Sequence, residues 1–232
     1  MSQLRTSLRK PALVLAGLLL SANALALSLA SLSQQDANGG LKDALTQGAQ
    51  IAVKQLGVPG GFSNNKDVRI QLPGKLGKAA GAMKQFGLGD QVDQLETSMN
   101  KAAEAAVPQA QAILVDAVKN MSVSDAKGVL TGGKDSATEY LNKSSRDQIR
   151  AKFLPIVKQA TDKVGLAQQY NAYAGRASAL GVMSGKDANV ESYVTEKALD
   201  GLFKMIAKQE ESIRANPAAA ATSLAQKVFG SL

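Results

Sequence analysis

Residues 128–134 have the spacing of a loop that cradles phosphate groups, G-x-x-x-x-G-K, formed by Gly128, Gly133 and Lys134. In such loops the backbone amides and the lysine hold the phosphates, and a Ser or Thr directly after the lysine holds magnesium. Here the next residue is Asp135, whose carboxylate would repel phosphate and would itself occupy the start of a helix. The glycines also follow a helical pattern instead of a strand. We therefore interpret this stretch as a helix end followed by a helix start.

Two serine–lysine pairs, Ser98 with Lys101 and Ser124 with Lys127, are each spaced about one helical turn apart. A buried lysine with a lowered pKa could act as the base for a serine nucleophile. The pattern is short, and the S-D-N and K-T-G motifs that accompany it in penicillin-recognising enzymes are absent. We therefore do not expect serine–lysine catalysis.

The chain contains no histidine and no cysteine. A Ser-His-Asp triad, a cysteine nucleophile, disulfides and the usual zinc sites are therefore excluded. No D-x-D-x-D-G loop for calcium occurs either, and we expect no cofactor. Acid–base chemistry by carboxylates stays open, with Glu104 near Pro108 and the pair Glu196 and Asp200 as candidates. Pairing with nearby lysines on a solvated face is the alternative.

The most unusual polar and aromatic cluster is Gln-Gln-Tyr-Asn-Ala-Tyr at residues 168–173. Tyr170 and Tyr173 share one helix face, so they could line a small ligand pocket. The alternative is two core tyrosines whose hydroxyl groups bind neighbouring helices. We assign no catalytic residue. With two polar residues from an alanine-rich helix earlier in the chain, the candidate ligand-binding residues are Asn100, Glu104, Gln168, Gln169, Tyr170, Asn171 and Tyr173.

Residues 1–26 have the features of a cleaved signal peptide. Arg5, Arg9 and Lys10 precede an apolar run, and a small-x-small pattern ends at Ala26. The apolar run is about half the ~20 residues that a membrane-spanning helix needs. We therefore expect cleavage near Ala26, no transmembrane segment afterwards, and an exported protein of the periplasm.

The net charge of the chain is +8, and loss of the three leader cations leaves +5. Such a balance favours weak attraction to anionic surfaces. The lysines are spread along the chain, and aromatic residues make up only 4% of it. Since base-stacking sites need aromatic side chains beside clustered cations, we do not expect a nucleic-acid partner.

The stretch from Asp90 to Met121 has apolar residues every three or four positions, which is the pattern of a long amphipathic helix. Asp90 is its predicted N-cap. Pro108 lies inside the pattern and has no N–H to donate, so we expect a kink there. Its middle is rich in alanine, which allows a neighbouring helix to come close.

Further helices are predicted from their caps and breakers. Ser33, Ser122, Asp135 and Asn189 are expected N-caps, and Pro217 is expected to open the last helix. Glycines weaken the first turns of the first of these helices, so its well-formed part is expected from Leu41. In the helix after Asp135, interruptions are expected at Ser144-Ser145 and at Pro155.

Residues 57–73 lack a helical pattern and contain turn residues. Val68, Ile70 and Leu72 alternate with polar residues, as in an extended segment. This segment either pairs with its copy in a dimer or lies as a strap over helices, and we favour the strap. The predicted fold is all-α, a single irregular domain of about eight helices over residues 27–232 with one long loop.

Seven stretches of the sequence carry a family resemblance, and they occupy residues 41–48, 68–73, 99–108, 126–133, 164–171, 194–203 and 213–218. Together they are similar to a bacterial exported family catalogued as domain of unknown function 4197. The resemblance runs over nearly the whole mature chain and implies an exported helical domain, but it brings no activity and no catalytic residues.

The leading functional hypothesis is a non-catalytic periplasmic protein that binds an unknown partner protein or an apolar or amphipathic ligand of the cell envelope. This hypothesis depends on the observation that the sequence contains no specific combination of catalytic residues. The alternative is a carboxylate-dependent hydrolase or lyase acting on envelope material, which requires two carboxylates in one cleft and at least one raised pKa.

Overall fold

The computed structural model describes residues 33–73, 89–162, 168, 170, 171 and 189–231. Within this part every regular element is a helix and no strand is present, which confirms the all-α prediction. Fewer α-helices than the expected eight or so are found there. The predicted signal peptide lies outside the described residues, as do Gln169 and Tyr173. The sequence pattern also predicts a short helix opened by Pro73 and a loop-rich stretch over residues 175–187, and both fall outside the described residues.

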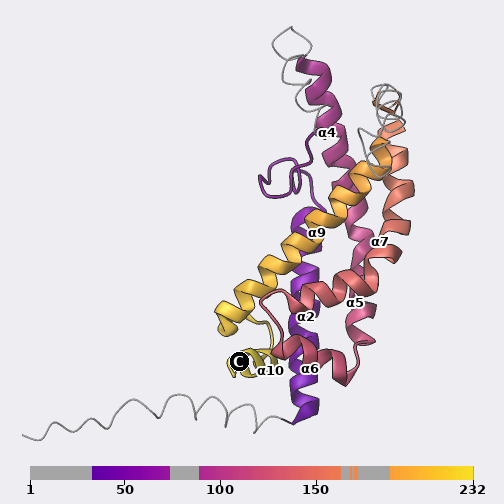
Figure 1. The fold of residues 1–232 in the computed structure, drawn as a ribbon. Coiled ribbons are helices and arrows are strands. Elements are labelled where there is room, and N and C mark those ends of the chain that lie inside the picture. Colours follow the sequence, from indigo (N-terminus) through magenta and orange to yellow (C-terminus); the bar gives the residue numbers. More distant parts are fainter. Residues whose placement is uncertain (1–32, 74–88, 163–167, 169, 172–188, 232) are drawn as a thin grey trace, which may run out of the picture.

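The elements follow one another along the chain as seven α-helices and two short 3-10 helices in the described part. Figure 1 shows their arrangement. In order they are α2 (Gln34–Leu56), α4 (Gly89–Ala106), η1 (Val107–Gln109), α5 (Ala110–Lys119), α6 (Val123–Thr131), α7 (Ser136–Asp162), α9 (Val190–Ala215), η3 (Pro217–Ala219) and α10 (Ser223–Phe229).

Helices α2, α7 and α9 make the most extensive packing contacts within the bundle. Helix α9 packs against α7, α2 and α4, and Figure 1 shows it crossing the bundle obliquely. Helix α2 packs against α9, α10, α5 and α6. The stretch with the strongest periodicity in the sequence, α4 to α5, is therefore one wall of the bundle and not its centre.

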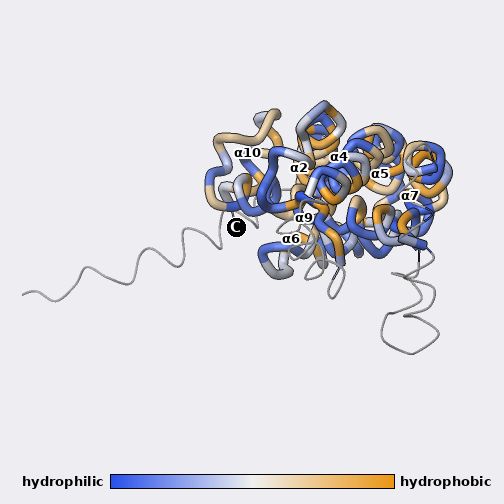
Figure 2. Tube along the Cα trace, turned by 90° about the horizontal axis from the view of Figure 1, so that it is seen from above, coloured by the Kyte–Doolittle hydropathy of each residue, from blue (hydrophilic) through white to orange (hydrophobic). Residues whose placement is uncertain are grey.

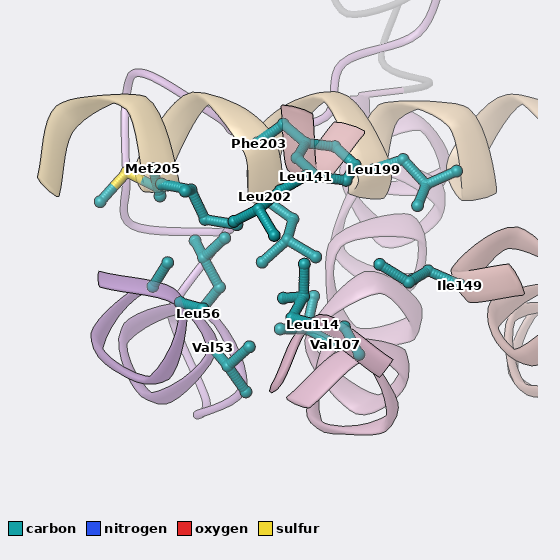
Figure 3. Packing of buried hydrophobic residues seen from close by; sticks show 14 of the residues in the cluster. Val53, Leu56, Val107, Leu114, Leu141, Ile149, Leu199, Leu202, Phe203 and Met205 are labelled. Carbon is teal, nitrogen blue, oxygen red and sulfur yellow. The ribbon is translucent and has the colours of Figure 1, made fainter. Parts of the chain in front are cut away.

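The core is built mainly from aliphatic side chains. Figure 3 shows Leu56 of α2, Leu114 of α5, Leu141 of α7 and Leu202 of α9 pointing into the same space, and all four are fully buried. Figure 2 shows hydrophilic and hydrophobic residues alternating along the helices, as expected for amphipathic helices. Burial of the hydrophobic faces is the main favourable term for this fold.

Helix α2 begins at Gln34, so the prediction that its ordered part starts at Leu41 is wrong. Ser33 caps the helix by accepting a hydrogen bond from the Asp36 amide. The reason for the glycines lies elsewhere: a Cβ on Gly40 would come within 2.8 Å of the Leu224 carbonyl oxygen of α10. The glycine therefore allows two helices to approach closely.

The predicted long helix is divided into α4, η1 and α5, with Pro108 inside the 3-10 turn. The break occurs where expected, because proline cannot supply the intrahelical hydrogen bond. Helix α4 begins at Gly89, so Asp90 lies in its first turn and is not the N-cap. The C-terminus of α2 abuts the break, since a Cβ on Gly57 would lie 3.0 Å from Cγ of Pro108.

Helix α7 is continuous through both positions where an interruption was expected. The hydroxyl groups of Ser144 and Ser145 donate to the carbonyl oxygens of Tyr140 and Leu141, so the serines bind the helix backbone without breaking it. Pro155 lies on the exposed side of the helix. Water can therefore serve the carbonyl oxygen that the proline leaves without its helical partner.

The predicted caps at Ser122 and Asn189 are confirmed. Ser122 and Asp125 form a reciprocal capping box at the start of α6, and Asn189 accepts from the Ser192 amide at the start of α9. Pro217, by contrast, opens only the 3-10 turn η3. Helix α10 starts later, where Thr222 accepts from the Ala225 amide.

Residues 62–72, named the strap from here on, lie across α4 and α9 of the same chain and contain no strand. Val68 and Ile70 point inward and are buried, whereas Arg69 and Gln71 are exposed. This is the arrangement that the alternating pattern predicted. Among the described residues no helix combines the length and apolar composition needed to cross a bilayer.

Candidate functional site

Three polar residues of α4, Glu96, Asn100 and Glu104, form the α4 ladder. They are spaced four apart, so they lie on one helix face. All three are at least nine-tenths buried, which is unusual for charged and amide side chains. Buried polar groups need hydrogen-bond partners, and the ladder finds them in the strap.

Asn100 binds both backbone polar groups of Ile70. Its Oδ1 accepts from the Ile70 amide at 2.8 Å, and its Nδ2 donates to the Ile70 carbonyl oxygen at 2.8 Å. The second hydrogen of Nδ2 goes to the Glu96 carbonyl oxygen at 2.7 Å. Asn100 therefore gives the extended backbone the same two hydrogen bonds that an adjacent β-strand would provide.

The two glutamates of the α4 ladder bind the strap on either side of Ile70. Oε1 of Glu104 accepts from the amides of Phe62 and Ser63 at 3.1 and 3.0 Å, and from the Ser63 hydroxyl at 2.9 Å. Oε1 of Glu96 accepts from the Leu72 amide at 3.4 Å. The buried carboxylate of Glu104, beside the helix break at Pro108, therefore has hydrogen-bond donors from Phe62 and Ser63 of the same chain.

Helix α9 supplies the opposite wall of this groove. The Tyr193 hydroxyl donates to the Gln71 carbonyl oxygen at 2.7 Å, and Nζ of Lys204 donates to the Asp67 carbonyl oxygen at 2.8 Å. Gly201 leaves a recess, because a Cβ there would lie 2.7 Å from the Phe62 ring. The strap therefore fits between a polar wall on α4 and a recessed wall on α9.

The second group of candidate residues lies beside α9. Asn171 accepts from the Val190 amide at 2.8 Å and donates to Glu191 at 3.1 Å, so it binds the first turn of α9. The Tyr170 ring is buried and stacks on Tyr193 at a centroid distance of 6.5 Å. Gln168 is exposed.

Tyr193 joins the two groups of candidate residues, since it stacks on Tyr170 and binds the strap that Asn100 holds. Sequence reasoning missed Tyr193, Glu96 and Gly201. The four-residue spacing from Glu104 through Asn100 could have pointed to Glu96. No local signal marks Gly201, because its role depends on a residue more than a hundred positions away.

Comparison with known proteins places the chain in a family. The family model described as "Protein of unknown function (DUF4197)" matches residues 31–230. The chain belongs to this family. The resemblance seen in the sequence is therefore confirmed. No curated protein and no solved structure gives a significant match.

In this DUF4197 member the first turn of the helix that follows the phosphate-loop spacing is already bound to a carboxylate. The amides of Ala137 and Thr138, in the first turn of α7, donate to the two carboxylate oxygens of Glu210 at 3.0 and 2.9 Å. Glu210 is buried and paired with Arg214 at 2.9 Å. A carboxylate from α9 therefore takes the position at the helix N-terminus that an anion would occupy.

The carboxylate pair of α9 is neutralised by arginines of α7. Arg146 binds Glu196 at 2.8 Å and Asp200 at 2.7 Å, and Arg150 also binds Glu196. Burial alone would raise the pKa of Glu196, but the hydrogen bonds and positive charges of Arg150 and Arg146 outweigh it and lower the pKa. A general acid needs a raised pKa, so this geometry favours an interhelical ion-pair network.

The serine–lysine pairs do not form a buried site. Lys101, Ser124 and Lys127 are exposed, and Ser98 is only partly buried. A base for serine needs a desolvated lysine, which exposure prevents. Within the described ranges, no group of acidic side chains gathers closely enough to hold a metal ion.

A small cavity lies between α2, α9 and α10. It is lined by six apolar or small residues and the buried Glu210, and its free space is about that of one water molecule. Binding a larger ligand there would require α2 and α9 to move apart. Its lining residues are Ala44, Leu45, Gly48, Ile206, Glu210, Ile213 and Phe229.

Proposed function

We propose that this DUF4197 member is a non-catalytic exported protein that binds a partner protein or an amphipathic ligand of the cell envelope. One observation carries the proposal. The polar groups that the sequence offered for catalysis are bound by groups of the same chain: Glu104 by the strap, Glu196 and Asp200 by arginines, and the α7 amides by Glu210. Such groups stabilise a scaffold instead of turning over a substrate.

The distribution of charge supports an anionic component in the ligand. The described residues contain equal numbers of Lys plus Arg and of Asp plus Glu. The net charge of +5 on the mature chain therefore belongs to residues 74–88 and 163–188 of the sequence. The first of these stretches contains three lysines and no acidic residue. Charge concentrated in this way attracts anionic surfaces more than the same charge spread evenly.

Native mass spectrometry tests the proposal directly. The mature protein is purified from its own periplasm and sprayed under conditions that retain non-covalent ligands. We expect a co-purified mass or a complex with a second protein. A monomer without ligand that also shows no thermal stabilisation by envelope lipids, cell-wall fragments or envelope extract would overturn the proposal. Turnover of any of these materials would overturn its non-catalytic part.

Co-flotation with vesicles containing anionic lipid tests the contribution of charge. The triple variant K75Q/K78Q/K84Q is expected to bind at least threefold less than the wild type at low salt, and added salt should weaken wild-type binding because it screens the attraction. The matched control K101Q/K152Q/K227Q removes the same charge from three exposed lysines of the described helices. Equal loss in both triple variants, or binding that salt does not change, would reject a localised attraction.

A further inference from the structure

The strap is bound as a peptide ligand is bound. The α4 ladder accepts from the amides of residues 62, 63, 70 and 72, and Asn100 donates to the carbonyl oxygen of residue 70. From α9, Tyr193 and Lys204 donate to the carbonyl oxygens of residues 71 and 67. All of these bonds end on main-chain atoms. Residues 61–68 consist mainly of turns, whereas residues 69–73 contain none, so the bonds to residues 70, 71 and 72 are the ones that an extended peptide in the same position could make.

Side-chain selection in the groove follows the alternation of an extended chain. Val68 and Ile70 are 8% and 2% exposed, whereas Arg69 and Gln71 between and beside them face solvent. The recess at Gly201 receives Phe62 and Val68, because a Cβ there would lie 2.7 Å from the ring and 3.2 Å from Cβ of Val68. The groove therefore selects apolar residues two positions apart. Arg69 between them is exposed and pairs with Glu96 of the α4 ladder at 3.5 Å.

We propose that this groove between α4 and α9 is a recognition site for an extended peptide with apolar residues at alternate positions, and that the strap is its internal occupant. This rests on the proposed function and names the chemical class of the partner. Main-chain hydrogen bonds supply affinity and alternate side-chain recesses supply specificity, as in other recognition of extended peptides. Such a peptide, offered by another envelope protein, replaces the strap.

Competition with the strap sets the expected affinities. A tethered occupant acts as a ligand at an effective concentration of about millimolar. The intact chain therefore binds a free peptide weakly, and a chain whose strap is impaired binds it more strongly. Tethering the strap in place should abolish binding. Asp67 pairs with Lys208 of α9, and the chain has no native cysteine, so a D67C/K208C variant can be joined there by a bismaleimide linker.

The experiment uses a fluorescent peptide with the sequence of residues 66–73 and measures anisotropy with the full mature chain. We expect the V68S/I70S variant to bind it at least tenfold more tightly than the wild type does. Adding N100A to that variant should weaken binding at least tenfold. The crosslinked D67C/K208C chain should not bind, and a control peptide carrying the changes V68S and I70S should not bind any of the proteins.

Equal binding to the V68S/I70S chain with and without N100A, or no binding to a folded V68S/I70S chain, would overturn the proposal. If that variant does not fold, hydrogen exchange on the wild type decides. Millimolar peptide should accelerate exchange at the Ile70 and Leu72 amides, and unchanged exchange overturns the proposal. If the peptide experiments fail but native mass spectrometry still finds a bound ligand, the groove is not the recognition site, and the proposed function still stands.

Discussion

The Asn100 side chain accepts from the amide of Ile70 and donates to its carbonyl oxygen, both at 2.8 Å. The pair is buried, at 1% and 2% exposure. A single amide side chain thus completes the hydrogen bonding of a non-helical residue inside an all-helical protein. Since loops are normally solvated, this contact explains how an irregular segment can lie against the core.

Replacing Asn100 by Ala should destabilise the protein by about 2–4 kcal/mol, because two buried main-chain groups of Ile70 lose their partners. Urea unfolding at neutral pH measures this change. Gln94→Ala is the matched control, since Gln94 is an exposed side chain of the same helix. It should change stability by less than about 0.5 kcal/mol. Equal stability of the two variants would contradict the structural role of Asn100.

Gly40→Ala should destabilise the protein although alanine is the better helix former. The added Cβ would lie 2.7 Å from Cγ2 of Val228 and 2.8 Å from the Leu224 carbonyl oxygen, so α10 must move. We expect a loss of about 1–3 kcal/mol, as for other overpacked contacts. Thermal unfolding measures it.

Gly128→Ala is the control for this substitution, because no atom beyond the adjacent residues and the backbone of α6 itself lies within 4 Å of a Cβ placed at Gly128. It should stabilise the protein by about 0.5–1 kcal/mol through helix propensity alone. The same chemical change is thus expected to have opposite signs at two helical glycines. Stabilisation at both positions would mean that α2 and α10 do not pack as closely as described.

The fold could be predicted from the sequence where local interactions decide it. The caps at Ser33, Ser122 and Asn189 act over three residues, and the apolar periodicity of α2 and α9 follows from helix geometry. The sequence misled where a distant contact overrides a local preference. The glycines of α2 indicated a weak helix start because glycine is a poor helix former. Their actual role is close packing against α10, which lies far away in the sequence and leaves no local signal.

Some residues of the cluster around the strap were selected from the sequence, and their role in ligand binding stays a prediction. Asn100 and Glu104 were selected as polar residues in an alanine-rich helix. In the structure both side chains are buried and hydrogen-bonded to specific partners. Their partners are backbone atoms of the strap, and backbone atoms leave no trace in a sequence pattern. Tyr170 and Asn171 were likewise selected, but their contacts with Tyr193 and Val190 depend on how α9 lies in the bundle.

Glu210→Ala should be among the most destabilising single substitutions. It removes the carboxylate that caps α7 at Ala137 and Thr138 and leaves Arg214, which is 16% exposed, without its ion-pair partner. Loss of one member of a buried pair costs about 3–5 kcal/mol. Glu211→Ala removes the neighbouring exposed carboxylate and should change stability by less than about 0.5 kcal/mol.

Hydrogen exchange separates this cap from a general loss of stability. Relative to the wild type, Glu210→Ala should accelerate exchange at the amides of Ala137 and Thr138 more than at amides in the middle of α7. The reason is that only the first turn of the helix loses its acceptor. Uniform acceleration over the whole helix would show that Glu210 supports the core without capping α7.

The ion pairs of Glu196 should make stability depend on pH in the acid range. Its pKa is below the ordinary value of 4.5 in the folded protein, because hydrogen bonds from Arg150 and Arg146 outweigh the effect of burial. A lowered pKa stabilises the folded state above the unfolded pKa, and this contribution disappears as the pH falls through the folded pKa. Glu196→Gln should therefore cost about 1–2 kcal/mol at pH 7 and much less near pH 3.

Urea unfolding of wild type and Glu196→Gln at both pH values measures the difference. The comparison cancels other carboxylates that titrate in the same range. Glu139→Gln, an exposed position on α7, serves as the control and should have a small effect at both pH values. A stability difference for Glu196→Gln that stays constant or grows toward pH 3 would contradict the ion-pair network. The reason is that protonation removes the negative charge of Glu196, which is the form that the arginines stabilise.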